Sequence, residues 1–110
     1  MLKIIAAVAL LITLGTAQAQ DLAPEQALPV CAGVYGTVSM YGSPQAQAFW
    51  TARARRVLNL AGTYNPNAGA IAGRLMERNI TRIRANDPTV ADEVGGALDY
   101  CNRYVARYGI

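Results

Sequence analysis

Apolar residues recur every three or four positions along four stretches of the chain, the spacing typical of amphipathic helices. The pattern predicts helices over residues 29–41, 44–61, 66–85 and 88–108. The last stretch is the most regular, and its apolar positions are Val90, Val94, Ala97, Cys101, Tyr104 and Tyr108. Because no stretch alternates as a strand would, the sequence predicts an all-α fold.

The expected helix ends carry the residues that usually start and stop helices. Three helices are expected to begin where a capping side chain precedes a proline, namely at Ser43–Pro44, Asn65–Pro66 and Asp87–Pro88. Glycines follow three of the expected ends: Gly42, Gly62 and Gly109. Inside the third helix, Gly69 and Gly73 lie on one face and suggest a close crossing. Gly95 and Gly96 suggest a kink in the fourth.

The first 19 residues have the pattern of a secretory signal peptide. Lys3 precedes a short apolar run over residues 4–14, and Ala17-Gln18-Ala19 fits a cleavage site. We expect cleavage after Ala19 and export to the periplasm or the exterior, with an uncleaved anchor as the alternative. Residues 20–28 show no periodicity and are expected to form a flexible tail before a single helical domain over residues 29–110.

The two cysteines, Cys31 and Cys101, are expected to form a disulfide because an exported chain meets oxidising conditions. In an antiparallel up-down-up-down four-helix bundle, the start of the first helix lies beside the end of the last. Both cysteines lie on the apolar stripes of those helices. The expected fold is therefore a small bundle cross-linked between its first and last helices.

Several chemistries are disfavoured by composition. The chain has no histidine and two cysteines, too few for a zinc site or a usual Ser-His or Cys-His nucleophile, so no metal or cofactor is expected. Val30 is too large for the residue before a lipid-attached Cys31. Asp92 and Asp99 could serve a small hydrolase, but negative charge early in a helix also suits the helix dipole. Thr89 and Asp92 suggest a capping box.

The charged residues suggest two surfaces for binding. Without Lys3, nine arginines face seven acidic residues, a balance too mild for a dedicated nucleic-acid binder. Arg74, Arg78 and Arg82 recur every four residues and could meet an anionic lipid, a glycolipid or an acidic protein. A solvated face is the alternative.

The fourth helix carries the second candidate surface. Arginines and tyrosines alternate there, at Tyr100, Arg103, Tyr104, Arg107 and Tyr108. Both residue types are enriched at interaction hot spots, although the tyrosines also fit the edge of a core.

These patterns favour an exported, non-enzymatic binding or accessory module, such as an inhibitor, a chaperone or an envelope component. Its expected partner is a protein or another envelope component. The alternatives are a membrane-surface protein that binds anionic lipid through the arginines, and a small hydrolase that uses Asp92 or Asp99.

Overall fold

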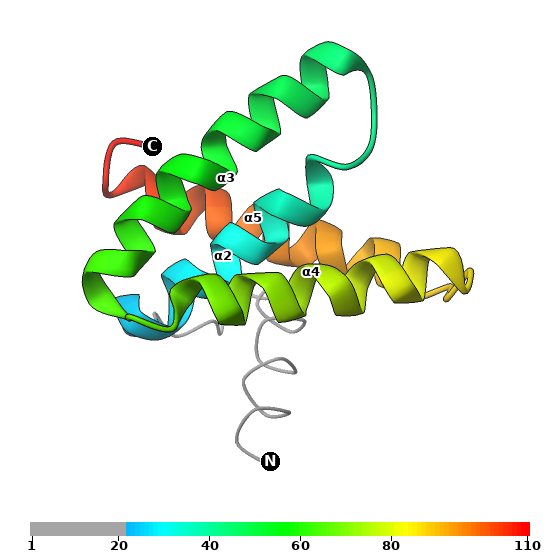
Figure 1. Ribbon diagram of the computed structural model, residues 1–110. Coiled ribbons are helices and arrows are strands. Elements are labelled where there is room, and N and C mark those ends of the chain that lie inside the picture. Colours follow the sequence, from blue (N-terminus) through cyan, green and yellow to red (C-terminus); the bar gives the residue numbers. More distant parts are fainter. Residues whose placement is uncertain (1–21) are drawn as a thin grey trace.

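The computed structural model describes residues 22–110, which fold into four α-helices (Figure 1). The helices are α2 (Pro24–Val38), α3 (Pro44–Tyr64), α4 (Ala68–Arg84) and α5 (Val90–Ala106). The expected signal peptide and its cleavage site lie outside the described residues.

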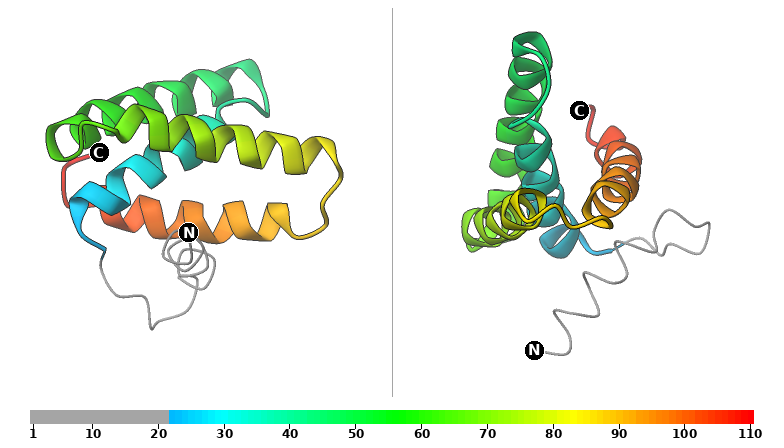
Figure 2. Two further views of the ribbon diagram at one scale, coloured as in Figure 1. Left: turned by 60° about the horizontal axis from the view of Figure 1, so that its bottom comes forward. Right: turned by 90° about the vertical axis from the view of Figure 1, so that its right-hand side faces the viewer.

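The chain reverses direction at each connection, so consecutive helices run antiparallel as predicted (Figure 1). In three dimensions, α3 and α4 form one side of the molecule, α5 forms the other, and α2 lies between them (Figure 2). Helix α2 packs against all three other helices, whereas α3 and α5 make little contact with each other. The fold is therefore a four-helix assembly around a central helix rather than a square bundle.

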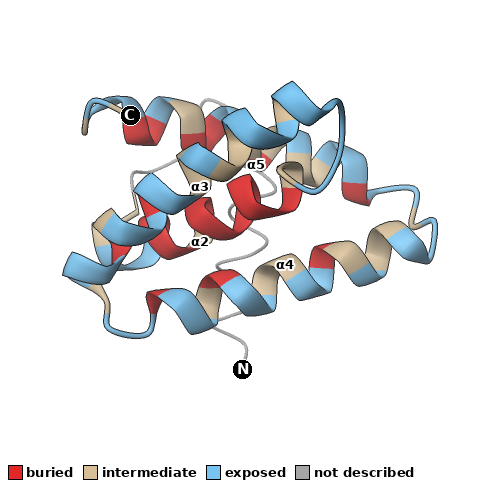
Figure 3. Ribbon diagram, turned by 45° about the horizontal axis from the view of Figure 1, so that its top comes forward, coloured by how far each residue is buried: buried red, intermediate tan, exposed pale blue. Residues whose placement is uncertain are grey.

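The central position of α2 is visible in its burial, which is nearly continuous from Ala27 to Thr37 (Figure 3). Two glycines allow α4 to approach it closely. A Cβ atom at Gly33 would lie 3.0 Å from the Ala72 carbonyl oxygen, and one at Gly36 would overlap the Met76 sulfur. The close crossing thus uses glycines of the first helix.

The glycines inside α4 and α5 do not have the roles that the sequence predicted for them. A Cβ at Gly69 or Gly73 would meet nothing within 4 Å, so the close crossing predicted there is wrong. Helix α5 is assigned without interruption through Gly95 and Gly96. Of the expected terminal glycines, Gly42 and Gly109 have positive φ angles of 93° and 77°.

The beginning of α2 differs from the prediction. The helix starts at Pro24, not at Pro29, so residues 24–28 of the expected flexible tail are helical. Pro29 lies buried inside the helix, where its missing N–H leaves the Glu25 carbonyl without its usual donor. The side-chain amide of Asn65 donates to that carbonyl at 2.9 Å. Asn65, at the end of α3, therefore supplies the hydrogen bond that Pro29 removes from α2.

Of the other predicted helix starts, the one at Ser43–Pro44 is confirmed, whereas the next two helices begin two residues after the predicted prolines. Ser43 caps α3, its hydroxyl accepting from the Ala46 N–H at 3.1 Å. Helix α3 continues past Gly62, where it was expected to end, and stops before Asn65. Asn65, expected to cap the next helix, thus ends α3 instead, and α4 begins at Ala68. The predicted capping box at Thr89 is wrong, because the Thr89 side chain makes no capping bond.

The disulfide between Cys31 and Cys101 is confirmed. It joins α2 to α5 with a Cα–Cα distance of 5.4 Å, and both cysteines are fully buried. The disulfide thus connects, inside the core, two residues that are 70 positions apart in the sequence.

Candidate binding groove

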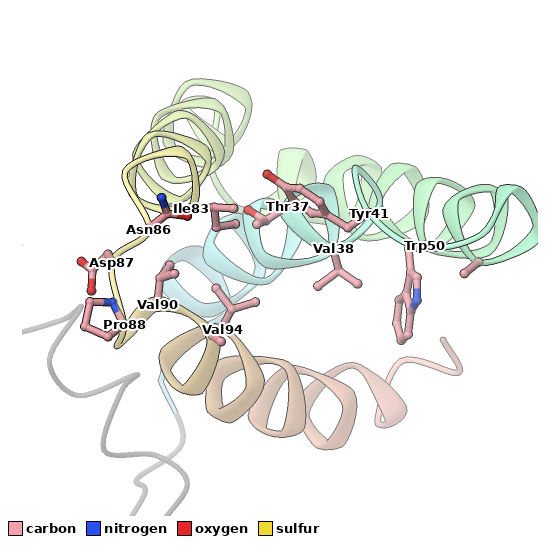
Figure 4. Close-up of a pocket in the computed structure, with 13 residues that line it drawn as sticks. Thr37, Val38, Tyr41, Trp50, Ile83, Asn86, Asp87, Pro88, Val90 and Val94 are labelled. Carbon is pink, nitrogen blue, oxygen red and sulfur yellow. The ribbon is translucent and has the colours of Figure 1, made fainter.

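An open groove of about 770 Å³ lies between the first halves of α3 and α5 (Figure 4). The end of α2 forms its floor, and the α4–α5 connection closes one end. Its principal apolar lining residues are Val38, Tyr41, Trp50, Ile83, Val90 and Val94. Figure 4 shows Val38 and Trp50 pointing towards α5, and Val94 pointing back from α5. The groove exists because α3 and α5 diverge on this side of α2.

The α3 wall is positioned by the turn that precedes it. Gly42 has a φ of 93°, a left-handed conformation that glycine adopts without strain, and it lets the chain reverse after α2. Ser43 then caps the new helix. Ala46, Phe49 and Trp50 follow at helical spacing on one side of α3. Ala46 and Trp50 form the α3 wall of the groove, with the Phe49 ring beside Trp50.

The Trp50 ring is held by neighbouring aromatic and cationic groups. It stacks on buried Tyr35 with ring centroids 5.8 Å apart, and Phe49 meets it edge-on at 4.9 Å. The Arg53 guanidinium lies 5.5–5.9 Å from all three ring centroids. These contacts fix Trp50 in the groove.

Arg53 is half-buried because it packs against these rings. Its guanidinium and the Tyr35 hydroxyl both donate to Asn102 Oδ1, at 3.2 and 2.7 Å, which ties α2 and α3 to α5. Burial raises the pKa of Tyr35, which keeps its hydroxyl a donor. Asn102 could not be identified from the sequence, because it lies outside the apolar stripe of its helix and its partners are 49 and 67 residues away in the chain.

The end of the groove is built by an ion-pair cluster in the α4–α5 connection. Arg82 donates to Asp87 at 2.8 Å, to Glu93 and to the Thr89 hydroxyl at 2.9 Å. Asp87 also accepts from the Thr89 N–H at 2.9 Å. The Arg82 and Thr89 hydrogen bonds lower the pKa of Asp87 to about 2. Asp87, the one carboxylate among the lining residues, is therefore ionised and fully engaged.

An exposed apolar patch continues from the groove. Met40 is 52% exposed, Tyr41 42% and Phe49 55%. The chain carries no charged residue between Glu25 and Arg53. The groove and this patch together form a mostly apolar, partly aromatic surface whose lining carboxylate, Asp87, is paired with Arg82. Helical spacing alone did not reveal this surface.

The predicted arginine ridge is divided by the fold. Arg74 and Arg78 are exposed and line a shallow hollow with Glu77 and Thr81. Arg82 also reaches this hollow, but its guanidinium is committed to Asp87 and Glu93. Arg82 is thus a structural residue of the α4–α5 connection.

The predicted tyrosine and arginine stripe lies mostly in the core. Tyr100 and Tyr104 are buried; the Tyr100 hydroxyl accepts from the Leu22 N–H at 3.3 Å, and the Tyr104 hydroxyl donates to the Leu22 carbonyl at 2.9 Å. Burial, the largest cause, raises the pKa of Tyr104. These two tyrosines therefore lie at the core edge, the alternative that the sequence left open, and hold the segment before α2.

The remaining members of the stripe differ in exposure. Tyr108 is half-buried against Tyr104, and the exposed Arg107 places its guanidinium 4.3 Å from the Tyr104 ring centroid. Arg103 is exposed. The stripe therefore leaves no continuous aromatic surface for a partner.

The groove offers no assembled catalytic machinery. Asp92 and Asp99 are exposed on α5, and neither lines the groove. Within residues 22–110, no three metal-ligating side chains gather in one place. None of the helices that the structure describes has the length and apolar character needed to cross a membrane. What the groove can do chemically is bury apolar groups.

Comparison of this chain with protein-family models, with curated proteins and with solved structures finds no match.

Proposed function

We propose that this chain is an exported, non-enzymatic binding module that acts through the groove between α3 and α5. The observation that carries the proposal is an open cavity of about 770 Å³ with aliphatic and aromatic walls. Burying apolar surface is the main driving force of protein association. A surface of this kind, flanked by exposed aromatic residues, is typical of an interaction site.

The chemistry of the groove favours an uncharged, apolar segment of a partner polypeptide. Small-molecule sites enclose most of their ligand, whereas this groove is open to solvent along one side (Figure 4). Exposed Met40, Tyr41 and Phe49 extend the contact surface beyond the groove itself. A cationic group would find no free countercharge, because Asp87, the carboxylate in the lining, is already paired with Arg82.

The hydrolase alternative has less support. Hydrolysis by paired carboxylates, as in glycosidases, needs the two groups to flank a bound substrate. Asp92 and Asp99 instead lie two helical turns apart on a solvent-exposed face and outside the groove.

The groove can be tested with an uncharged apolar dye, N-phenyl-1-naphthylamine, because Trp50 is the single tryptophan of the chain and lines the groove. We expect energy transfer from Trp50 to the bound dye. Ala91→Arg places a charge at an exposed lining position and should weaken dye binding by about tenfold or more. Ala48→Arg, exposed on α3 outside the lining, is the matched control and should leave binding unchanged. Equal effects of both variants, or absent energy transfer, would contradict the proposal.

Export is tested separately by the mass of the protein recovered from a bacterial expression host. Cleavage after Ala19 would leave Gln20 as the first residue. An intact mass that still includes residues 1–19 in the exported fraction would contradict the expected processing.

A further inference from the structure

Exposed arginines are concentrated on the side of the molecule formed by α3 and α4. The exposed arginines of these two helices are Arg55, Arg56, Arg74, Arg78 and Arg84. Glu77 is their only acidic residue. On the opposite side, α5 exposes Asp92 and Asp99 with one arginine, Arg103. The side formed by α3 and α4 therefore carries net positive charge, whereas on the α5 side Arg103 and the exposed Arg107 just after the helix offset Asp92 and Asp99 (Figure 2).

The guanidinium groups at the centre of this basic side are free to meet a partner. In residues 22–110, the ion pairs formed by arginine involve Arg82 with Asp87 and Glu93, and none involves Arg74 or Arg78. Arg74 and Arg78 are four residues apart and line the same hollow on α4. Charges that are not neutralised internally attract an anionic surface over about a Debye length, ~8 Å at physiological salt.

The same side also exposes apolar groups between the two helices. A furrow of about 190 Å³ is lined by Ala54, Arg55 and Leu58 from α3 and by Ala72 and Met76 from α4. Because α2 forms its floor, the furrow opens away from α5. Leu58 is 36% exposed there, next to Arg55. A basic side with exposed apolar side chains matches the headgroup region of an anionic bilayer.

We propose that the side formed by α3 and α4 binds the surface of a membrane that contains anionic lipid. A membrane fits better than single-stranded nucleic acid, because no aromatic side chain that could stack on a base lines either the arginine hollow or the furrow. It also fits better than a folded protein, whose interface has a packed apolar core, because the apolar furrow on this side measures only about 190 Å³. A fluid bilayer supplies phosphate groups wherever the arginines lie. This interaction leaves the groove between α3 and α5 open for its own partner.

Vesicle co-sedimentation tests the proposal with the oxidised protein. Vesicles of phosphatidylcholine with about one third phosphatidylglycerol should bind it, vesicles of phosphatidylcholine alone should not, and added salt should release it. Arg74→Gln with Arg78→Gln should weaken binding by a factor of about 10 to 30, at roughly fivefold for each arginine at the surface.

The control variant combines Arg103→Gln with Ala106→Glu, two exposed positions of α5, and lowers the net charge by the same two units. It should weaken binding far less. Both variants have the same residues 1–19, so any contribution of the apolar run at residues 4–14 to vesicle binding is equal in the two and cancels in the comparison. Leu58→Gln should also weaken binding, whereas Met40→Gln, outside the furrow, should not.

Three results would overturn the proposal. The first is equal binding to neutral and anionic vesicles. The second is an equal loss in the two charge variants, which would reveal an effect of net charge alone. The third is binding to duplex DNA, at the same salt, that is as tight as binding to vesicles and equally sensitive to Arg74→Gln with Arg78→Gln. That result would identify a general polyanion binder. Circular dichroism of each variant establishes that the helices are intact.

Discussion

Single polar residues decide several contacts that hydrophobic patterning does not predict. Asn79 lies buried in α4 and donates to the Thr37 hydroxyl at 3.2 Å, and Thr37 donates in turn to the Gly33 carbonyl at 2.9 Å. The sequence shows only that an asparagine interrupts an apolar stripe. Its partner on α2 is 42 residues away and becomes known only when the two helices pack.

The Thr37–Asn79 hydrogen bond can be measured by a double-mutant cycle. Thr37→Val leaves the buried Asn79 amide without its acceptor and should lower the free energy of unfolding by about 1–3 kcal/mol. Adding Asn79→Leu removes both polar partners and should recover much of that loss. Urea unfolding followed by circular dichroism gives these values. Strictly additive losses would show that the two side chains do not depend on each other.

At the scale of the helices, the sequence predicted which segments are helical better than where they begin. Ser43–Pro44 gave the start of α3 because capping is local. Pro29 was misleading, since a proline is typical of a first turn but here lies inside α2. That position is tolerated because Asn65 satisfies the Glu25 carbonyl, a contact across 40 residues. Local rules fail where a distant residue supplies the missing bond.

Glycines on the central helix should respond differently from those on the surface. Gly33→Ala would place a methyl group 3.0 Å from the Ala72 carbonyl oxygen and 3.1 Å from the Leu75 Cβ. We expect it to destabilise the protein by about 1–3 kcal/mol. Gly73→Ala, helical and unobstructed, should stabilise it by about 0.5–1 kcal/mol. Melting temperatures should therefore shift in opposite directions, and a shared direction would contradict the close approach of α4 to α2.

The α4–α5 connection should lose stabilisation in acid. The folded pKa of Asp87 is about 2, below its ordinary value of 3.8, so its ion pair stabilises the fold at neutral pH. That contribution is lost as the pH falls from near 4 towards 2. The melting temperature of wild type should exceed that of Asp87→Asn at neutral pH, and the gap should narrow over this range. A gap that stays constant with pH would contradict the ion pair.

At the scale of the molecule, the helical class, the antiparallel order and the Cys31–Cys101 pairing followed from the sequence. The groove did not, because it depends on how far α3 and α5 diverge around α2. The sequence likewise could not separate exposed arginines from Arg82, whose carboxylate partners lie in the next connection and helix. Contacts and distances between helices could therefore not be predicted from the sequence, whereas features within one helix could.

The disulfide should supply a large share of the stability of so small a fold. Replacing both Cys31 and Cys101 with alanine removes a cross-link between residues 70 positions apart, so the unfolded chain gains conformational freedom. We expect the free energy of unfolding to fall by about 4 kcal/mol, as measured with urea under non-reducing conditions. A loss below about 1 kcal/mol would show that α2 and α5 hold together without the cross-link.

The most direct test of the groove is a map of amide chemical shifts on addition of N-phenyl-1-naphthylamine to the ¹⁵N-labelled protein. We predict that the largest shifts cluster at Val38, Tyr41, Val90 and Val94 and at the Trp50 indole, while Arg74 and Arg78 on α4 stay unchanged. Shifts concentrated on α4, or spread evenly over the four helices, would contradict the assignment of the groove as the binding site.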